Sequence, residues 1–213
     1  MHTDSTNVKR GSKAAQSEAT RAKLVKVARR LFAKRGYSAV GTEEIVKKAG
    51  VTRGALYHQF EDKKDLLRAV FEQVESEVAQ GITTRAAAAT SDPIEALRIG
   101  ARLWLDASLD PEVRRIVLLD APSVLGWEEW REIVGRYGLG LLAAGLAGAM
   151  DTGAIERQPV MPLAHVITGA LDAAALYVAE ADDPHAAKDE MVPVLDRLVE
   201  TLQPKRTRGS RKA

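Results

Sequence analysis

A nine-residue segment, TRGALYHQF, contains residues suited to contact with nucleic acid. Arg53 can donate two hydrogen bonds to one guanine, which is worth roughly 1–3 kcal/mol of discrimination between bases. Gly54 has no side chain and permits close approach of the backbone to a duplex. Ala55, if it faces outward, can contact a thymine methyl group. Tyr57 and His58 can donate to phosphate oxygens, and such contacts fix the register of a protein on DNA.

These residues need a helix that presents them on its outer side. Leu56 and Phe60 are four residues apart and so share one face, which we expect to be buried. Thr52 is a suitable N-cap for this helix. A second short helix precedes it, with Thr42 as its expected N-cap and Gly50 at its end. Two short helices joined by a tight turn can place the second in the major groove, although a plain helical hairpin with a solvated face shows the same spacing.

Residues 20–68 resemble the DNA-binding domain of the TetR family of bacterial transcriptional regulators. The resemblance rests on LFAKRGY, then a T-x-x-x-I pattern, then AGVTRGALY and FEDKKDLL. Val46 departs from it where alanine is usual, and Gln59 departs where aromatic or histidine residues are common. By position and residue type, the expected DNA contacts are Thr42, Thr52, Arg53, Gly54, Ala55, Tyr57, His58 and Lys63.

The resemblance implies an all-α homodimer that binds a palindromic operator on double-stranded DNA. A small-molecule effector in the body of each chain would separate or tilt the two DNA-reading heads, which makes the expected function that of a ligand-released repressor. The dimer interface would be formed by the last two helices. No catalytic residues, metal site or cofactor are expected.

The charge distribution agrees with a polyanion partner at one end of the chain. Residues 1–71 contain 16 lysines and arginines against 7 acidic residues, whereas residues 72–203 contain 10 against 22. The last ten residues add 5 basic residues and no acidic ones, so a net charge of +2 conceals a basic first third and an acidic body. A basic region next to a DNA-reading motif indicates phosphate binding.

Composition narrows the class further. The chain has 213 residues and no cysteine, which excludes disulfides and thiolate metal sites and agrees with a cytoplasmic protein. The first residues have no apolar core, so no secretory signal is expected there. The apolar run of residues 139–150 is shorter than a bilayer requires, so no membrane partner is expected.

No segment alternates with a period of two residues, so we predict an all-α fold of about nine helices. The expected parts are a disordered basic arm (1–16), the DNA-binding domain (17–68), a ligand-binding and dimerisation domain (69–203) and a basic tail (204–213). Ser17 or Thr20 should cap the first helix. Pro122 should break a helix, a long segment should follow to Met150, and another helix should run from about Leu163 to Ala179.

Aromatic residues gather in the first half of the body. They are Trp104, Trp127, Trp130 and Tyr137. The last three recur at helical spacing, which suits either one wall of a ligand pocket or an ordinary core.

Acidic residues within apolar runs add to the pocket hypothesis. Asp120 and Asp172 would be costly to bury unless they are paired with arginine or meet a cationic ligand, whose charge an aromatic ring can also attract. Arg131 beside two tryptophans is the argument for an anionic ligand instead. The expected ligand-binding residues are Trp104, Asp120, Trp127, Trp130, Arg131, Tyr137 and Asp172, and the preferred effector is lipophilic, aromatic and cationic.

Five glycines lie between residues 135 and 148, where each costs a helix up to about 1 kcal/mol relative to alanine. Close helix packing, a bend or room for a ligand would each explain them.

Two other classes of protein remain as alternatives to a ligand-responsive regulator. An all-α enzyme has no supporting motif, and a DNA-binding architectural protein without a ligand would have a filled body.

Overall fold

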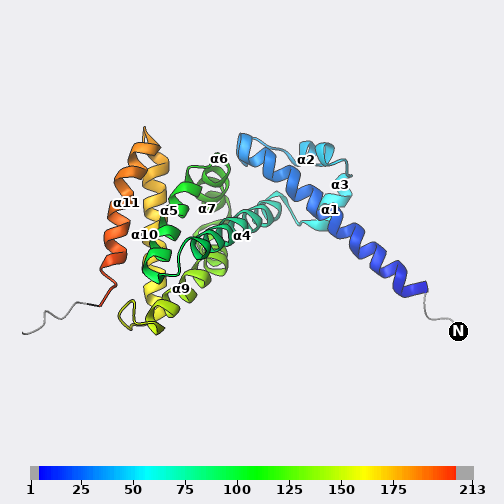
Figure 1. Ribbon diagram of the computed structural model, residues 1–213. Helices are drawn as coiled ribbons and strands as arrows, with labels where there is room; N and C mark the ends of the chain where they lie inside the picture. The colour runs from blue at the N-terminus through cyan, green and yellow to red at the C-terminus, as the bar shows by residue number, and fades with distance from the viewer. Residues whose placement is uncertain (1–4, 205–213) are drawn as a thin grey trace, which may run out of the picture. The chain divides into compact units, whose positions relative to one another are not determined.

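The computed structural model describes residues 5–204, with side chains from residue 14 onward, and every regular element in this range is helical (Figure 1). The predicted all-α class is therefore confirmed. Nine continuous helical segments form within the described residues, and two of them include a π-helical part. The elements are α1 (Ser5–Arg35), α2 (Thr42–Ala49), α3 (Arg53–Gln59), α4 (Lys63–Ala89), α5 (Pro93–Ser108), α6 (Pro111–Val113), η1 (Arg114–Asp120), α7 (Ala121–Leu125), α8 (Trp127–Val134), η2 (Gly135–Leu139), α9 (Gly140–Asp151), α10 (Val160–Glu180) and α11 (Pro184–Glu200).

The chain folds into two compact units. Unit 1 consists of the residues up to Val74 together with 111–131, and unit 2 consists of 75–110 and the residues from 132 onward. Helix α4 therefore begins in unit 1 and ends in unit 2. The boundary predicted after residue 68 does not anticipate that 111–131 belongs with the N-terminal helices.

In unit 1, α1, α2 and α3 pack against one another, and the start of α4 adds further buried side chains to the core. Phe32, Phe60 and Phe71 are fully buried there, together with Ile45 and Leu56. Burying a side chain of this size stabilises a fold by about 1.5–3 kcal/mol. Short helices such as α2 and α3 gain most of their stability from such packing, since isolated helices of this length are marginal in water.

In unit 2, α10 packs beside α11, and both contact α5 (Figure 1). Ion pairs reinforce this group at its surface. Arg102 donates to Asp196 at 2.5 Å, and Lys188 donates to Asp106 at 2.6 Å. These two ion pairs connect α5 to α11.

Several helix ends agree with the local sequence. The hydroxyl of Thr52 accepts a hydrogen bond from the backbone N–H of Ala55 at 3.1 Å, as expected of an N-cap. Asp92 and Asp183 cap α5 and α11 in the same way. Gly50 ends α2 with a φ of 65°, a conformation that residues with a β-carbon adopt at a cost.

Other boundaries differ from the predictions. Helix α1 begins at Ser5, so part of the segment predicted to be disordered is helical, in keeping with its alanine, lysine and glutamine content. Gly41, and not Thr42, is the N-cap of α2. Pro122 does not break a helix, because the helical segment continues from η1 through α7 to Leu125. Residues 1–4, the side chains of residues 5–13 and all residues from 205 onward lie outside the described part, so most of the predicted basic arm and basic tail is not described.

Two further corrections concern the body. The long segment predicted after Pro122 is interrupted at Gly126, whose φ is 91°. Helix α10 begins at Val160 instead of about Leu163, with Pro162 accepted in its first turn.

Two helical stretches, Trp127–Asp151 and Val160–Glu180, are long and apolar enough to cross a membrane by length and composition alone. The apolar run of residues 139–150 thus belongs to a stretch of 25 residues, longer than the sequence indicated. Core helices of soluble proteins meet the same criterion, so two such stretches are weak evidence for a membrane segment.

Candidate functional site

The outer face of α3 is the first candidate site, and it lies in unit 1. Leu56 and Phe60 are 0% and 1% exposed, which anchors one side of the helix in the core. Arg53, Gly54 and His58 are exposed on the other side, together with Tyr57. The two-sided helix predicted from sequence spacing is therefore present in the fold. Thr52 is exposed at its N-terminus, and Ala55 is half-buried.

Arg53 is held only loosely. One guanidinium nitrogen lies 3.9 Å from a carboxylate oxygen of Glu43, and both side chains are largely exposed. The guanidinium carbon lies 5.6 Å from the centre of the Tyr57 ring. Exposed ion pairs of this kind contribute about 0–1 kcal/mol, so the Arg53 side chain can exchange Glu43 for another partner at little cost.

Gly54 has no internal reason to be glycine. A β-carbon at this position would meet only the hydroxyl oxygen of Thr52, at an ordinary contact distance of 3.9 Å. Its φ also lies outside the left-handed region. The absence of a side chain therefore matters only to something that approaches α3 from outside.

Lys63 does not extend freely from the start of α4. Its ammonium group donates to the carbonyls of Tyr37 and Val40, each at 3.0 Å, and lies 3.9 Å from the centre of the Tyr37 ring. Burial lowers the pKa of Lys63, and the nearby Asp120 carboxylate partly offsets this. Two of its three N–H donors thus hold the loop between α1 and α2. Thr42, half-buried in the first turn of α2, lies where no side chain caps the helix amides.

Gln59 orients α3 against α1. Its side-chain amide nitrogen donates to the hydroxyl of Ser17 at 2.7 Å, and its backbone carbonyl accepts from Arg21 at 3.1 Å. The Arg21 guanidinium also stacks 4.3 Å from the centre of the Phe60 ring. Gln59, which departs from the family pattern, therefore has a structural role that the sequence did not reveal.

Residues 111–131 make polar contacts with the N-terminal helices of the same unit. Arg29 forms a two-point ion pair with Glu112, at 3.0 and 2.7 Å, and Asp120 accepts from the backbone N–H of Tyr37 at 2.7 Å. Glu129 accepts from Arg68 and lies 3.2 Å from the ammonium group of Lys64. Burial alone would raise the pKa of Glu129, but these two cations outweigh it and hold the pKa below its usual value.

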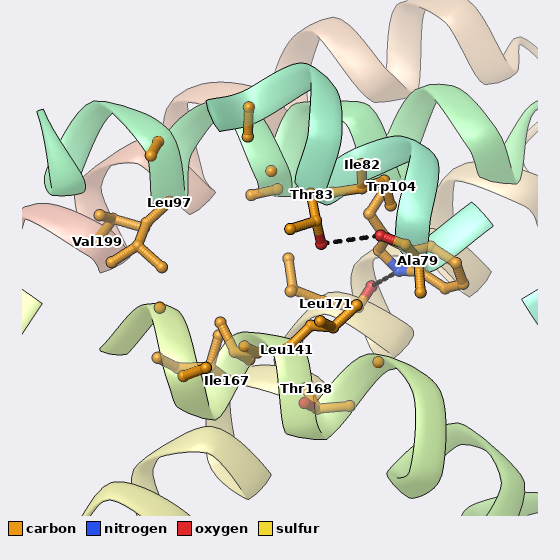
Figure 2. Close-up of a pocket in the computed structure, with 18 of the residues that line it drawn as sticks. Ala79, Ile82, Thr83, Leu97, Trp104, Leu141, Ile167, Thr168, Leu171 and Val199 are labelled. Carbon is orange, nitrogen blue, oxygen red and sulfur yellow. Dashed lines mark hydrogen bonds between the residues drawn. The ribbon is translucent and has the colours of Figure 1, made fainter. Parts of the chain in front are cut away.

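The second candidate site is a cavity of about 540 Å³ in unit 2 (Figure 2). This volume lies within the usual range for small-molecule pockets. Helices α4, α5, α9, α10 and α11 supply most of its walls, which are largely apolar. Ile82, Leu97, Leu141 and Leu171 face one another across the space in Figure 2.

Polar groups of the cavity wall are mostly satisfied within the protein. The indole N–H of Trp104 donates to the carbonyl of Leu171 at 3.2 Å, and the hydroxyl of Thr83 donates to the carbonyl of Ala79 at 2.9 Å (Figure 2). Glu75 is the exception. Its side chain is 4% exposed, and its Oε2 atom has no hydrogen-bond partner.

Only two of the seven predicted ligand-binding residues line this cavity, namely Trp104 and Asp172. Trp127 and Trp130 belong to unit 1, where their rings stack with centres 4.9 Å apart. The Trp130 indole N–H donates to the carbonyl of Val117 at 3.0 Å, as in an ordinary core. Asp120 and the exposed Arg131 are also in unit 1, and Tyr137 is in unit 2 outside the lining.

Sequence reasoning missed Glu75, although its position gave an indication. It lies between Phe71, Val74 and Val78 in the repeating apolar positions of α4. An acidic residue in such a stripe is directed toward the core, where burial raises its pKa. The pKa of Glu75 rises to about 8 because of burial and the negative charge of Asp172, whose own pKa rises to about 6 through burial.

The glycines of α9 leave space. Gly145 and Gly148 line the cavity, and a β-carbon on either would meet no atom within 4 Å. Close packing therefore does not explain these two glycines, whereas room in the cavity does. Gly138 differs, because its β-carbon would lie 3.5 Å from a carboxylate oxygen of Glu75.

An exposed face runs along the last two helices. On α10, Val166 and Tyr177 are 69% and 56% exposed, with the small residues Gly169 and Ala173 exposed between them. On α11, Val194 is 61% exposed and Leu198 is 39% exposed. Apolar side chains grouped in this way at helical spacing are typical of an interaction surface.

Both candidate sites lie in regions that resemble known protein domains. Residues 24–70 match the profile described as bacterial regulatory proteins of the tetR family, and residues 94–202 match the profile described as the tetracyclin repressor-like C-terminal domain. The first match contains α2 and α3, and the second contains most of the helices that surround the cavity.

Individual relatives agree with these matches. A solved structure of a TetR-family transcriptional regulator from Pectobacterium atrosepticum is 34% identical, covers 90% of this chain and 97% of its own, and superposes with a TM-score of 0.79. The HTH-type transcriptional regulator AcrR of Shigella flexneri is 36% identical over 103 residues, 48% of each protein. The transposon Tn10 TetC protein of Escherichia coli is 36% identical over 114 residues, 54% of this chain and 57% of its own. The matches to these curated relatives thus span about half of their length.

Proposed function

Because this chain belongs to the TetR family of DNA-binding transcriptional regulators, we propose that it is a homodimeric repressor released from a palindromic operator by a small lipophilic or aromatic effector. Members of this family are regulators and not enzymes, and they bind operators and dimerise. The operator, the effector response and the dimer interface of this chain are the proposed parts. A cytoplasmic location follows from the proposed function.

The observation that carries the DNA-binding proposal is the exposed face of α3. Arg53 is loosely held and can reach a guanine edge, while Tyr57 and His58 are exposed and can donate to phosphates. Gly54 leaves the backbone open to close approach. Lys63 is better assigned to holding the α1–α2 loop than to phosphate contact, because two carbonyls already accept from its ammonium group.

The apolar face of α10 and α11 supports dimerisation through the last two helices. Gly169 and Ala173 let two helices approach closely, and Val166, Tyr177 and Val194 offer apolar area for burial. A twofold axis at this face would give two copies of α3. The operator half-sites would then be about 34–36 Å apart, or a multiple of that spacing.

The cavity supports effector control. Its walls include the second half of α4, and the first half of α4 belongs to the unit that contains α3. A ligand that binds better in one arrangement of α4 than in the other shifts the equilibrium between them by its difference in affinity. Glu112, Asp120 and Glu129 bind residues 111–131 to the N-terminal helices. We therefore expect residues 111–131 to move together with the DNA-binding helices.

Fluorescence anisotropy with duplexes from the upstream region of the chain's own gene tests this function. We expect the dimer to bind a palindromic segment at least 100-fold more tightly than a scrambled duplex. An equal affinity for both would contradict a specific regulator. Binding that no lipophilic compound relieves would favour a DNA-binding protein without an effector, and a reporter fusion would show whether the bound protein represses.

A further inference from the structure

We propose that the cavity of unit 2 binds a lipophilic cation and that the carboxylate of Glu75 neutralises the charge of the ligand. This inference depends on the proposed function only in identifying the cavity as the effector site. It assigns the ligand class and the recognition residue, neither of which follows from family membership.

One oxygen atom of a buried carboxyl group in the cavity wall has no hydrogen-bond partner. Glu75 lies on α4 and lines the cavity with 4% of its side chain exposed, and no group within the described residues bonds to its Oε2 atom. A buried polar atom left without a partner costs about 1–3 kcal/mol, and more when it is charged. A ligand that supplies a positive charge removes this cost, so the carboxyl group favours such a ligand over a neutral one.

Both ionisable side chains that line the cavity are acidic. Within the lining, Glu75 from α4 and Asp172 from α10 are the ionisable side chains. The walls supplied by α5, α9 and α11 contribute apolar, small or neutral polar residues. Two acidic groups and no compensating cation would therefore disfavour an anionic ligand, whereas the same two groups would attract a cation.

The remaining cavity wall is mostly apolar and includes one aromatic ring. Trp104 lines the cavity with its N–H already engaged by Leu171, which leaves its ring available to the ligand (Figure 2). A cation over an aromatic ring gains about 0.5–2 kcal/mol, depending on how fully water is excluded. Leucines, isoleucine and alanines supply the rest, so the ligand's charged group should be attached to an apolar body.

The protonation of Glu75 gives the proposal a specific signature. Because its pKa lies near 8 without ligand, the carboxyl group is mostly protonated at pH 7. A bound cation stabilises the ionised form, so binding releases close to one proton. The apparent affinity for a permanent cation should therefore rise by roughly tenfold or more between pH 6 and pH 8.

The test uses three probes that share a biphenyl body. They are (4-phenylbenzyl)trimethylammonium, its neutral carbon isostere 4-neopentylbiphenyl, and the anion (4-phenylphenyl)methanesulfonate. Binding to the full-length dimer is measured by calorimetry in buffers of different ionisation enthalpy, at pH 6, 7 and 8. We expect the cation to bind most tightly, with proton release and the pH dependence given above.

Two variants locate the effect. Glu75→Gln should weaken cation binding by roughly tenfold or more and abolish most of the proton release, while binding of the neutral probe changes less than twofold. Glutamine resembles the protonated carboxyl group, so this variant should fold, and its melting curve checks that. Glu156→Gln removes an exposed acid outside the lining and should change neither quantity.

The outcomes separate this inference from the proposed function. Equal or tighter binding of the neutral or anionic probe, or no binding of any probe, would overturn the cation site. So would cation binding that Glu75→Gln leaves intact. If the cation binds as expected but does not release a bound upstream duplex, the cation site stands and effector control of DNA binding fails.

Discussion

The outer face of α3 and the cavity of unit 2 use charge in opposite ways. Arg53 is exposed, loosely paired and ready to exchange partners, whereas Glu75 is buried with one carboxylate oxygen unpartnered. On the surface, a charge costs little to keep and gains little from any one contact. In the cavity, the same unit of charge is costly and strongly selects what can bind beside it.

This difference follows from what each region must recognise. A DNA backbone offers many repeated charges, so many weak exposed contacts suffice and affinity depends on salt. A small ligand offers one charge, so its recognition needs a group from which water has been removed. Four predictions test this contrast.

The largest effect should appear in the stability of Glu75→Gln as a function of pH. The folded-state pKa of Glu75 is raised to about 8 from 4.5, so the folded protein retains a proton that the unfolded chain loses between these values. Wild-type stability should fall by about 1.4 kcal/mol for each pH unit in this window. Urea unfolding between pH 6.5 and 8, above the range in which the raised pKa of Asp172 also lowers stability, should show this decline for the wild type and a much flatter line for the variant. Parallel lines would contradict the burial of a titrating Glu75.

Arg53→Ala should weaken operator binding by about 1–3 kcal/mol for each half-site and relax base preference at the position that Arg53 reads. Arg157→Ala removes a comparably exposed arginine from unit 2 and serves as the control. Gel shifts on the operator and on single-base variants measure both effects. Equal losses for the two variants would mean that general charge, and not base contact, explains the role of Arg53.

Lys63→Met separates two roles of one residue. Methionine keeps the apolar stem but removes the donors to Tyr37 and Val40, so we expect a loss of about 1.5–3 kcal/mol in stability, the usual value for hydrogen bonds to a charged group. The salt dependence of operator binding should stay unchanged. A reduction of the logarithmic salt slope by about one, with stability intact, would instead identify Lys63 as a phosphate contact.

Gly148→Ala should give the smallest effect. Since a β-carbon there meets nothing within 4 Å, alanine should stabilise α9 by up to about 1 kcal/mol. This corresponds to a rise in melting temperature of roughly 2–4 °C. Gly126→Ala is the matched control and should destabilise, because φ is 91° at that position. A loss of stability in Gly148→Ala would show that the space beside α9 is filled.

The two regions also differ in how far the sequence predicts them. The outer face of α3 could be predicted from the sequence because Leu56 and Phe60 follow the period of a helix. Thr52 and Gly50 are residue types typical of the start of one helix and the end of the preceding one. The exposed residues then follow by elimination. The position of Lys63 near the start of a helix was also predicted. Its contacts with the loop carbonyls of Tyr37 and Val40 were not, because they depend on the tertiary fold and not on residue spacing.

The cavity was harder to predict from the sequence because its walls come from helices far apart in the chain. Trp127 and Trp130 have the spacing of a pocket wall, yet the fold places them in unit 1, where Trp130 bonds to Val117. Trp104 and Asp172 were found because a large aromatic and an acid stand out in apolar runs. Glu75 was overlooked in a helix with many acids, since only the position of α4 in the fold shows which of them is buried.

The salt dependence of both binding reactions, measured on one preparation, tests the account most directly. Affinity for the palindromic upstream duplex is determined between 50 and 200 mM salt, and affinity for (4-phenylbenzyl)trimethylammonium is determined over the same range. We expect a steep fall for DNA, with a logarithmic slope near −0.9 for each phosphate contact, and an almost flat line for the cation in its buried site. A flat line for DNA would contradict the reading face of α3, and a steep one for the cation would contradict a buried carboxylate as its partner.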